Sequence, residues 1–319
     1  MLNKIAIGVA VILSGLALLA SCVGISIDEA SVFRPPPVAN KAEHVDDMYI
    51  EWQDVFERPS NFTFTNNINN DHATIRITKD EFVPTKVTHG FWANGTIAVT
   101  EMSASSTDRP LVIHCGGNAS DRYGFGALFG LKIIPYADLV IFDYPGYGDS
   151  PGKPSASSFE EMLDNLAEEI HLRRDPERPL VLWGYSLGGF VCAELSKSVT
   201  GVDAVVIESS AKDARSAARE LVPGLIRPFV KLRLSPSLSS YNNASALMDF
   251  EGQVLVLAGQ QDGILPSTLS EALVTELRSA GVAVSYQEFP DGNHANLATL
   301  PAFRRALDAF FSDLEVSQS

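Results

Sequence analysis

The chain contains 319 residues, of which 45% are hydrophobic and 20% are charged. It is long enough to bury one large core, and a single α/β domain of about 250 residues fits this length. The formal net charge of −15 argues against a nucleic-acid-binding role, because phosphates would repel such a surface, and it offers no general attraction to anionic lipid.

The N-terminus has the pattern of an export signal. Lys4 precedes an uncharged, mostly apolar stretch from Ile5 to Ala20, and the segment ends in Leu19-Ala20-Ser21-Cys22. This ending resembles the lipobox of bacterial lipoproteins, which implies cleavage before Cys22 and acylation of that residue. An uncleaved transmembrane helix is the alternative, but sixteen residues are fewer than the roughly 20 that a span needs. Because Val23 replaces the aspartate of inner-membrane lipoproteins, the resemblance implies an outer-membrane anchor where the cell has one, with the domain outside the cytoplasm.

The chain is expected to divide into three parts. These are a signal peptide at 1–21, a lipid-anchored tether with an N-terminal extension at 22–60, and a folded domain at 61–319. The tether is polar up to about residue 40 and contains Pro35-Pro36-Pro37, which favours an extended spacer that holds the domain off the bilayer. Met48, Trp52, Val55 and Phe56 then follow at helical spacing, and this stripe either contacts lipid or packs on the domain.

The remaining chain alternates predicted strands with predicted helices. This alternation indicates a mostly parallel sheet that is covered by helices on both faces. Asn94-Gly95 is typical of a hairpin turn among the first strands. The expected strands are 73–78, 96–102, 110–115, 138–142, 181–183, 202–207, 254–258 and 282–289, and the expected helices are 123–131, 159–171, 187–198, 267–280 and 297–314.

The sequence Val181-Leu182-Trp183-Gly184-Tyr185-Ser186-Leu187-Gly188-Gly189 predicts a nucleophile elbow. A strand that turns into a helix within a few residues forces Ser186 into strained backbone angles, and the flanking glycines leave room for the neighbouring backbone. The serine hydroxyl then stands at a helix N-terminus, where unpaired N–H groups favour a developing oxyanion.

From about residue 73 to 314 the chain resembles the α/β-hydrolases. The resemblance is carried by G-Y-S-L-G at 184–188, G-G-N-A-S at 116–120, F-D-Y-P-G-Y-G at 142–148, Asp262 and His294. It implies an α/β-hydrolase fold with a mostly parallel central sheet, helices on both faces and little or no cap domain. The Gly-Asn-Ala loop and the tyrosine-glycine run are similar to the compact branch that includes protein depalmitoylases. That branch usually reads His-Gly-Asn-Ala, whereas this chain reads His114-Cys115-Gly116-Gly117-Asn118.

A catalytic serine needs a base and a third group that orients the base. In α/β-hydrolases the acid and then the histidine follow the serine along the chain. Asp262 comes directly after a predicted strand, where it can act as this acid or simply cap a helix. Glu208, at the end of the preceding strand, is the rival acid, and the resemblance favours Asp262. His294 lies between the last strand and the last helix, from where it can reach Ser186.

The other histidines are expected to have other roles. His114 stands at a strand end, where a structural hydrogen bond is expected, and His171 ends a helix, where its charge suits the helix dipole. His44, His72 and His89 come too early in the chain and are expected at the surface.

The oxyanion hole should combine the N–H of Leu187 with an N–H from the loop after the third strand, and Asn118 is the candidate there. Asp143 and the glycines after it are expected to shape the pocket rim. Cys115 and Cys192 have apolar contexts; a disulfide is possible in an exported protein, but we expect two buried thiols. The chain shows no Cys/His cluster with ligand spacing, so no metal is expected.

A stretch between residues 209 and 252 is too short for a large cap. Its apolar residues are expected either to line an acyl pocket or to form the inner face of sheet-covering helices. These residues are Leu221, Leu225, Ile226, Phe229, Val230 and Leu232.

Together these features predict a lipid-anchored serine hydrolase that cleaves a carboxylic ester or thioester through a Ser186 acyl-enzyme and needs no cofactor. The alternatives are a serine peptidase or amidase of the same fold and a non-catalytic surface lipoprotein. The expected partners are an acyl substrate and, through Cys22, a membrane; the oligomeric state stays open.

Overall fold

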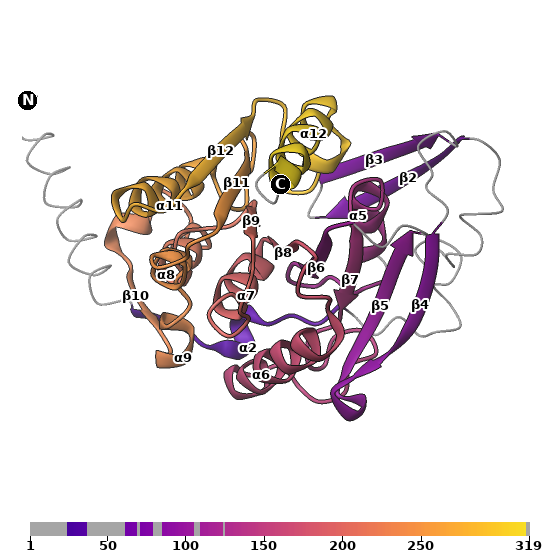
Figure 1. The fold of residues 1–319 in the computed structure, drawn as a ribbon. Coiled ribbons are helices and arrows are strands. Elements are labelled where there is room, and N and C mark those ends of the chain that lie inside the picture. The colour runs from indigo at the N-terminus through magenta and orange to yellow at the C-terminus, as the bar shows by residue number, and fades with distance from the viewer. Residues whose placement is uncertain are drawn as a thin grey trace, which may run out of the picture.

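An eight-stranded sheet forms the centre of the fold, with the order β12-β11-β9-β8-β6-β7-β5-β4 (Figure 1). The computed structural model describes residues 24–36, 61–68, 71–78, 85–104, 109–123 and 125–316. The predicted signal peptide, Cys22 and the 48–56 stripe therefore lie outside the described residues. The strands are β4 (Thr85–Trp92), β5 (Ile97–Ala104), β6 (Leu111–Cys115), β7 (Asp138–Phe142), β8 (Leu180–Tyr185), β9 (Ala204–Glu208), β11 (Gln253–Gly259) and β12 (Val284–Phe289).

The sheet is parallel from β7 to β12, and only the pairs β4–β5 and β5–β7 are antiparallel. Strands β6 to β9 are almost wholly buried, as their near-continuous apolar sequences require when both faces of a sheet are covered. The predicted fold class is thus confirmed: this is an α/β-hydrolase fold.

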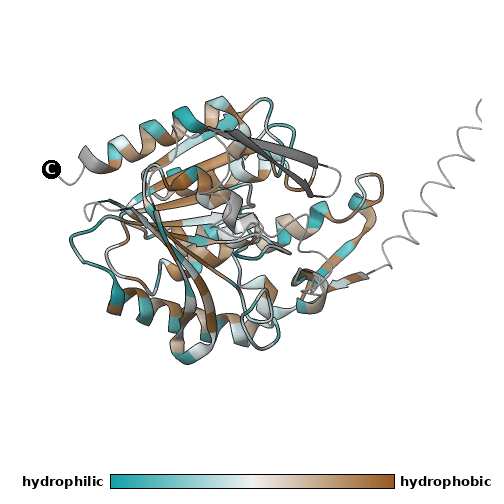
Figure 2. Ribbon diagram, turned by 90° about the vertical axis from the view of Figure 1, so that its right-hand side faces the viewer, coloured by the Kyte–Doolittle hydropathy of each residue, from teal (hydrophilic) through white to brown (hydrophobic). Residues whose placement is uncertain are grey.

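Helices cover both faces of the sheet. Apolar residues of α6 (Ala156–Arg173), α7 (Leu187–Leu195) and α11 (Ser267–Ser279) join one core cluster, and those of α5 (Phe125–Ile133) and α12 (Pro301–Val316) join the other. In Figure 2 the central strands are mostly brown, whereas the outer surfaces of the long helices are largely teal. The two cores follow from the amphipathic pattern of these helices.

The early strands differ from the expectation. The predicted strand at 73–78 belongs to β3 (Asp71–Thr78), which pairs with β2 (Asn61–Ile68) in a separate two-stranded sheet. The hairpin at Asn94-Gly95 instead joins β5 to β4, which the sequence analysis missed. Strand β4 lies at the edge of the sheet and reads Thr-Lys-Val-Thr-His-Gly-Phe-Trp, so its polar residues hide the apolar alternation that usually predicts a strand.

No large cap covers the segment between β9 and β11. It holds only short elements, namely α8 (Ala214–Glu220), a 3₁₀ turn at Arg227–Phe229, β10 (Lys231–Leu234), α9 (Pro236–Ser239) and α10 (Asn243–Leu247). Both expectations for its apolar residues are wrong at four positions, where prolines and short elements leave the side chains in solvent. The exposed fractions are 66% for Leu221, 90% for Leu225, 46% for Ile226 and 41% for Phe229.

The N-terminal segment 24–36 is part of the domain. Its first strand, β1 (Gly24–Ile27), pairs in parallel with β10, and a single turn of helix, α2 (Glu29–Val32), follows. Phe33 is buried and stacks on Phe159 of α6 with ring centroids 4.5 Å apart. The expected free spacer is therefore wrong for residues 24–36, because strand pairing and a buried aromatic ring hold them on the domain. We call residues 24–36 the N-terminal strap.

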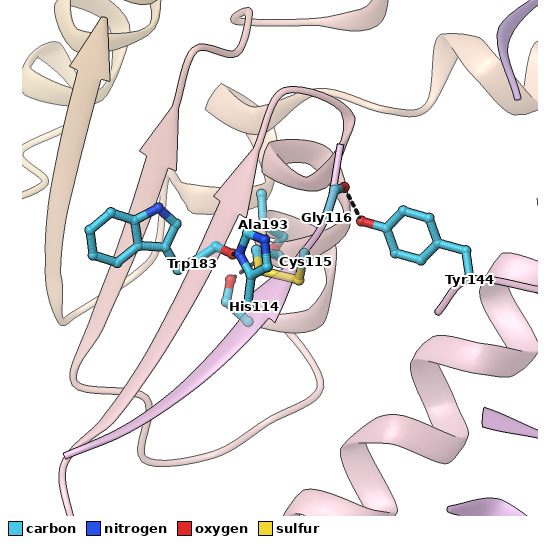
Figure 3. Close-up of a disulfide and its surroundings, with 8 residues drawn as sticks. His114, Cys115, Gly116, Tyr144, Trp183 and Ala193 are labelled. Atoms are coloured by element: carbon cyan, nitrogen blue, oxygen red, sulfur yellow. Dashed lines mark hydrogen bonds between the residues drawn. A yellow bond between two sulfur atoms is a disulfide. The ribbon is translucent and has the colours of Figure 1, made fainter. Parts of the chain in front are cut away.

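A disulfide joins Cys115 at the end of β6 to Cys192 on α7 (Figure 3). Their Cα atoms are 6.0 Å apart, so the expectation of two free buried thiols is wrong. The residues are buried and apolar as expected, but β6 and α7 pack directly against one another and bring the two side chains together. In the described residues, no helix meets the length and hydropathy of a membrane span, and no group of three His, Cys, Asp or Glu is placed to hold a metal.

The disulfide closes a loop of 77 residues. Its loss in Cys115→Ala/Cys192→Ala should reduce the free energy of unfolding by about 2–5 kcal/mol, since the unfolded chain regains loop freedom. Chemical denaturation of the oxidised protein and the double variant measures this difference. Peptide mapping without reductant should recover the linked pair, and free thiols at both positions would contradict the assignment.

Candidate active site

The turn at Ser186 is a strained strand-to-helix connection. Ser186 has φ 54° and ψ −114°, which a residue with a side chain rarely adopts, and it stands between the last residue of β8 and the first of α7. A Cβ at Gly184 would lie 2.2 Å from the carbonyl oxygen of Gly188, and a Cβ at Gly188 would lie 1.9 Å from that of Cys115. The predicted turn is present, and its geometry requires glycine at both positions.

Three residues from distant parts of the sequence meet at this turn. His294 Nε2 lies 3.1 Å from Ser186 Oγ, and His294 Nδ1 lies 2.7 Å from Asp262 Oδ2. Asp262 and His294 are both 5% exposed, so the pair is shielded from water while Ser186 remains partly accessible. In such a chain the imidazole can accept the serine proton while the carboxylate fixes its tautomer and stabilises the resulting imidazolium.

Asp262 uses both carboxylate oxygens. Oδ1 accepts hydrogen bonds from the N–H groups of Ile264 and Leu265, each at 2.8 Å, and Oδ2 faces His294. The two alternatives from the sequence, a turn-capping aspartate and an orienting acid, therefore coexist in one side chain. The backbone bonds fix the carboxylate so that its second oxygen stays in line with the imidazole.

Tyr185, the residue before the serine, also holds His294 in place. Its hydroxyl donates a 2.9 Å hydrogen bond to the carbonyl oxygen of His294, and the side chain is 4% exposed. Its ring also borders Gly117, where a Cβ would lie 2.7 Å from two ring carbons. The Gly-x-Ser-x-Gly motif allows any residue at this position, and no local pattern could have shown its partner, 109 residues away.

The rival acid Glu208 does not contact His294. Its Oε2 accepts a 2.8 Å hydrogen bond from Trp183 Nε1, while its backbone carbonyl accepts the N–H of Ser186 at 2.8 Å. Burial raises the pKa of Glu208 to about 7, because the one bond from Trp183 offsets only part of the desolvation. Glu208 is therefore a buried structural residue that contacts Trp183 and the backbone of Ser186.

His114 is likewise structural. It is fully buried, its ring stacks on Phe129 at 3.8 Å, and its Nδ1 lies 3.2 Å from the carbonyl oxygen of Trp183. Burial lowers the pKa of His114 to about 3, so the ring is neutral and Nδ1–H donates to that carbonyl.

Two other histidines also have polar partners away from Ser186. His171 lies near the C-terminus of α6, where Nε2 contacts the N–H and hydroxyl of Thr200. His89 on β4 pairs with the hydroxyl of Thr100.

Asp143 has a structural role in the loop that follows β7. It accepts hydrogen bonds from the backbone N–H groups of Arg122 and Asp149 and forms an ion pair with the Arg122 guanidinium. A Cβ at Gly148, where φ is +47°, would lie 2.2 Å from this carboxylate. The loop therefore depends on a buried charge pair that the sequence pattern did not reveal.

The two candidate oxyanion donors have different surroundings. Leu187 is the first residue of α7, so its N–H is one of those that a helix leaves without an intrahelical acceptor. The Asn118 side chain is hydrogen-bonded to the N-terminal strap. Its Oδ1 accepts a hydrogen bond from the N–H of Arg34 at 2.9 Å, and its Nδ2 donates one to the carbonyl oxygen of Val32 at 2.6 Å. The Asn118 loop is also held by Tyr144, whose hydroxyl donates to Gly116 O (Figure 3).

Comparisons with known proteins agree with this fold. A family model described as "Alpha/beta hydrolase family" matches residues 111–241. The chain is 27% identical over 174 residues to the phosphatidylserine lipase ABHD16A of Rattus norvegicus, an alignment that covers 54% of this chain and 31% of that protein. It is 34% identical over 178 residues to an uncharacterised Mycobacterium tuberculosis protein, which covers 52% of this chain and 57% of the relative. The chain thus spans less than two thirds of the length of each of these relatives.

Among solved structures, an esterase of Pyrococcus furiosus superposes with a TM-score of 0.56 and 13% sequence identity. The superposition covers 74% of this chain and 93% of the esterase. At this identity the likeness concerns the fold alone.

The buried Glu208 predicts a pH dependence of stability. Its pKa rises from 4.5 in a free side chain to about 7 in the folded protein. The folded state therefore keeps the proton on Glu208 to a higher pH than the unfolded state does. The free energy of unfolding should be highest below pH 4.5 and should fall by about 3 kcal/mol as the pH rises to about 7. Denaturation of Glu208→Gln, which keeps an acceptor for Trp183, should show this part of the slope removed.

Asp143, whose pKa burial raises to about 6, is present in both proteins, so its own contribution cancels in the comparison. Identical pH profiles for the parent and Glu208→Gln would contradict the assignment of a neutral, buried Glu208.

Proposed function

We propose that the chain, which has an α/β-hydrolase fold and matches an alpha/beta hydrolase family model over residues 111–241, is a serine hydrolase that cleaves a carboxylic ester or thioester through an acyl-enzyme on Ser186. The observation that carries this proposal is the chain of two hydrogen bonds from Ser186 Oγ through His294 to Asp262. Each of the three side chains is chemically competent for its part, which favours an enzyme over a non-catalytic binding protein.

In the proposed reaction, His294 Nε2 takes the hydroxyl proton as Ser186 Oγ attacks the substrate carbonyl. The N–H groups of Leu187 and Asn118 hold the oxyanion, and Asp262 stabilises the imidazolium. The imidazolium then gives its proton to the departing alcohol or thiol, which leaves the acyl group on Ser186. A water molecule, deprotonated by His294, attacks the acyl-enzyme, and the proton returns to Ser186 Oγ as the carboxylic acid departs.

One relative supports an ester as substrate. The curated relative from rat is named a phosphatidylserine lipase. The amidase alternative requires subsites for a peptide, which the described site does not by itself indicate. We therefore favour an ester or thioester over an amide.

We further propose that the domain lies outside the cytoplasm, anchored through acyl chains on Cys22. The lipobox-like Leu19-Ala20-Ser21-Cys22 supports this placement. So does the disulfide between Cys115 and Cys192, because structural disulfides persist mainly in oxidising compartments.

A fluorophosphonate probe should label the protein, because such probes react with activated serines, and Ser186→Ala should abolish the label. The same variant should reduce kcat for ester hydrolysis by roughly 10⁴-fold or more, since the nucleophile is lost. In-gel fluorescence and p-nitrophenyl ester hydrolysis measure the two effects. Ser209→Ala, at the neighbouring buried serine, is the matched control and should keep the label. Labelling that survives in Ser186→Ala would contradict the proposed nucleophile.

A panel of p-nitrophenyl esters, acyl thioesters and aminoacyl amides should separate the substrate classes. We expect kcat/KM to be highest for an ester or thioester, because alcohol and thiol leaving groups need less proton transfer than an amine. Fastest turnover of the amides would replace this proposal with a peptidase or amidase.

Tyr185→Phe tests the positioning of His294. Loss of one hydrogen bond of about 1 kcal/mol should lower kcat roughly fivefold while KM changes little, because the bond orients the base and does not hold substrate. Tyr136→Phe removes a hydroxyl bound to Asp308 on α12, away from the site, and serves as the control. Equal kcat values for both variants would show that Tyr185 does not position His294.

A further inference from the structure

Four large apolar side chains project into solvent from one short stretch of the chain. They are Leu221, Leu225, Ile226 and Phe229, with exposed fractions from 41% to 90%. Exposed Pro223 and Pro228 lie among them, so the stretch is apolar almost throughout. A cluster of this kind on a domain surface usually marks a binding surface for a protein or a membrane.

The longer segment around this stretch is basic, although the whole chain is strongly acidic. Residues 214–234 contain five Arg or Lys and one Glu, a net charge of +4, whereas the whole chain carries −15. Arg227 pairs with Glu220, and the remaining four basic side chains are all exposed. These exposed residues are Arg215, Arg219, Lys231 and Arg233. The surface beside the apolar cluster is thus suited to a negatively charged partner.

Within β10, charge and burial alternate. Lys231 and Arg233 point to solvent, whereas Leu232 and Leu234 pack against the core. The backbone of β10 is fixed on one side by β1, with Gly24 opposite Lys231 and Ser26 opposite Arg233. The two cations are therefore held on an ordered strand directly after the apolar cluster. We call Leu221, Leu225, Ile226, Phe229, Lys231 and Arg233 the basic apolar face.

The expected lipidation site lies close to the basic apolar face. Gly24, opposite Lys231, is only two residues after Cys22. Consecutive Cα atoms are about 3.8 Å apart, so acyl chains on Cys22 would begin within roughly 8 Å of the Gly24 Cα. A bilayer that holds those chains must then lie against the edge of the domain formed by β1 and β10.

The N-terminal strap connects this edge to the active-site loop. In Figure 1 the indigo chain starts beside β10, forms α2 and continues toward the middle of the fold. On the way, Glu29 accepts hydrogen bonds from the N–H of Ala156 and the hydroxyl of Ser237. The strap ends on the Asn118 side chain through Val32 and Arg34. The strap therefore links the edge formed by β1 and β10 directly to the Asn118 loop.

We propose that the basic apolar face docks on the surface of an anionic lipid bilayer and orients the active site toward it. The apolar side chains enter the interfacial region, and the cations contact anionic headgroups. The lipid anchor alone would leave the domain free to rotate, whereas a second contact a few residues away in space fixes one orientation. The functional meaning of that orientation rests on the proposed hydrolase activity; the docking itself does not.

A bilayer explains the combination of features better than a second copy of this chain. Two copies that paired through this face would bring their basic side chains together, and like charges would oppose the contact. An anionic bilayer offers charged headgroups to the cations and an apolar interior to the exposed apolar side chains.

The test measures which side of the protein meets the membrane. The full chain, purified in its processed form, is reconstituted in phosphatidylcholine vesicles that contain phosphatidylglycerol and a doxyl-labelled lipid. A thiol-reactive fluorophore is placed at Leu225→Cys or, as control, at Leu172→Cys. Leu172 is also an exposed leucine, at 73%, but it lies at the end of α6, where the chain returns to the start of β8 and thus to the sheet edge opposite the elbow.

We expect the doxyl lipid to quench the probe at residue 225 several-fold more than the probe at residue 172. Lys231→Glu/Arg233→Glu, or high salt, should remove most of that difference. Arg304→Glu/Arg305→Glu on α12 makes the same change in net charge on another face and should leave it unaltered. Equal quenching at the two positions, or a chain that does not bind the vesicles, would overturn the proposal.

Shielding of the residue 225 probe from iodide that grows with protein concentration, without quenching by lipid, would assign the face to a second copy and also overturn it. The measurement is repeated in Ser186→Ala, because quenching needs no hydrolysis. Failure of the hydrolase assays therefore leaves this result intact, and failure of docking leaves the hydrolase assignment intact.

Discussion

The site depends on one strained turn. Ser186 adopts φ 54° because β8 must become α7 at a point where the backbones of residues 184, 188 and 115 nearly touch. This turn places the hydroxyl 3.1 Å from His294 Nε2, and His294 is in turn held by the Asp262 carboxylate and the Tyr185 hydroxyl. The buried sheet around the turn supplies the packing that offsets the strain.

Two further connections hold the loop opposite the serine. The Cys115–Cys192 disulfide ties the end of β6, from which the loop departs, to the helix that begins at the elbow. The N-terminal strap reaches the other end of the loop through Asn118. The same strap begins beside the basic apolar face, so the part of the chain nearest the expected lipid anchor is also the part that contacts the active-site loop. In our proposals, membrane attachment and catalysis therefore share one structural element.

The predictable features were those with a strong local pattern. The buried parallel strands and amphipathic helices followed from apolar runs and helical spacing, and the elbow followed from glycine on both sides of Ser186. The features that were missed depend on distant partners. The Tyr185 bond to His294, the Arg122–Asp143 ion pair and the disulfide join residues far apart in sequence. Strand β4 was missed because an edge strand can be polar, and the strap because a proline-rich polar segment gives no sign of the strand it will pair with.

The most direct test of the account is to trap the intermediate. The protein is mixed with an activated acyl ester, quenched in acid within the first turnover and digested for mass spectrometry. The account predicts that the peptide containing Ser186 gains the mass of the acyl group, that hydroxylamine removes it, and that His294→Ala does not form it. Turnover of the ester with no acyl group on Ser186, or with the acyl group on another residue, would contradict it.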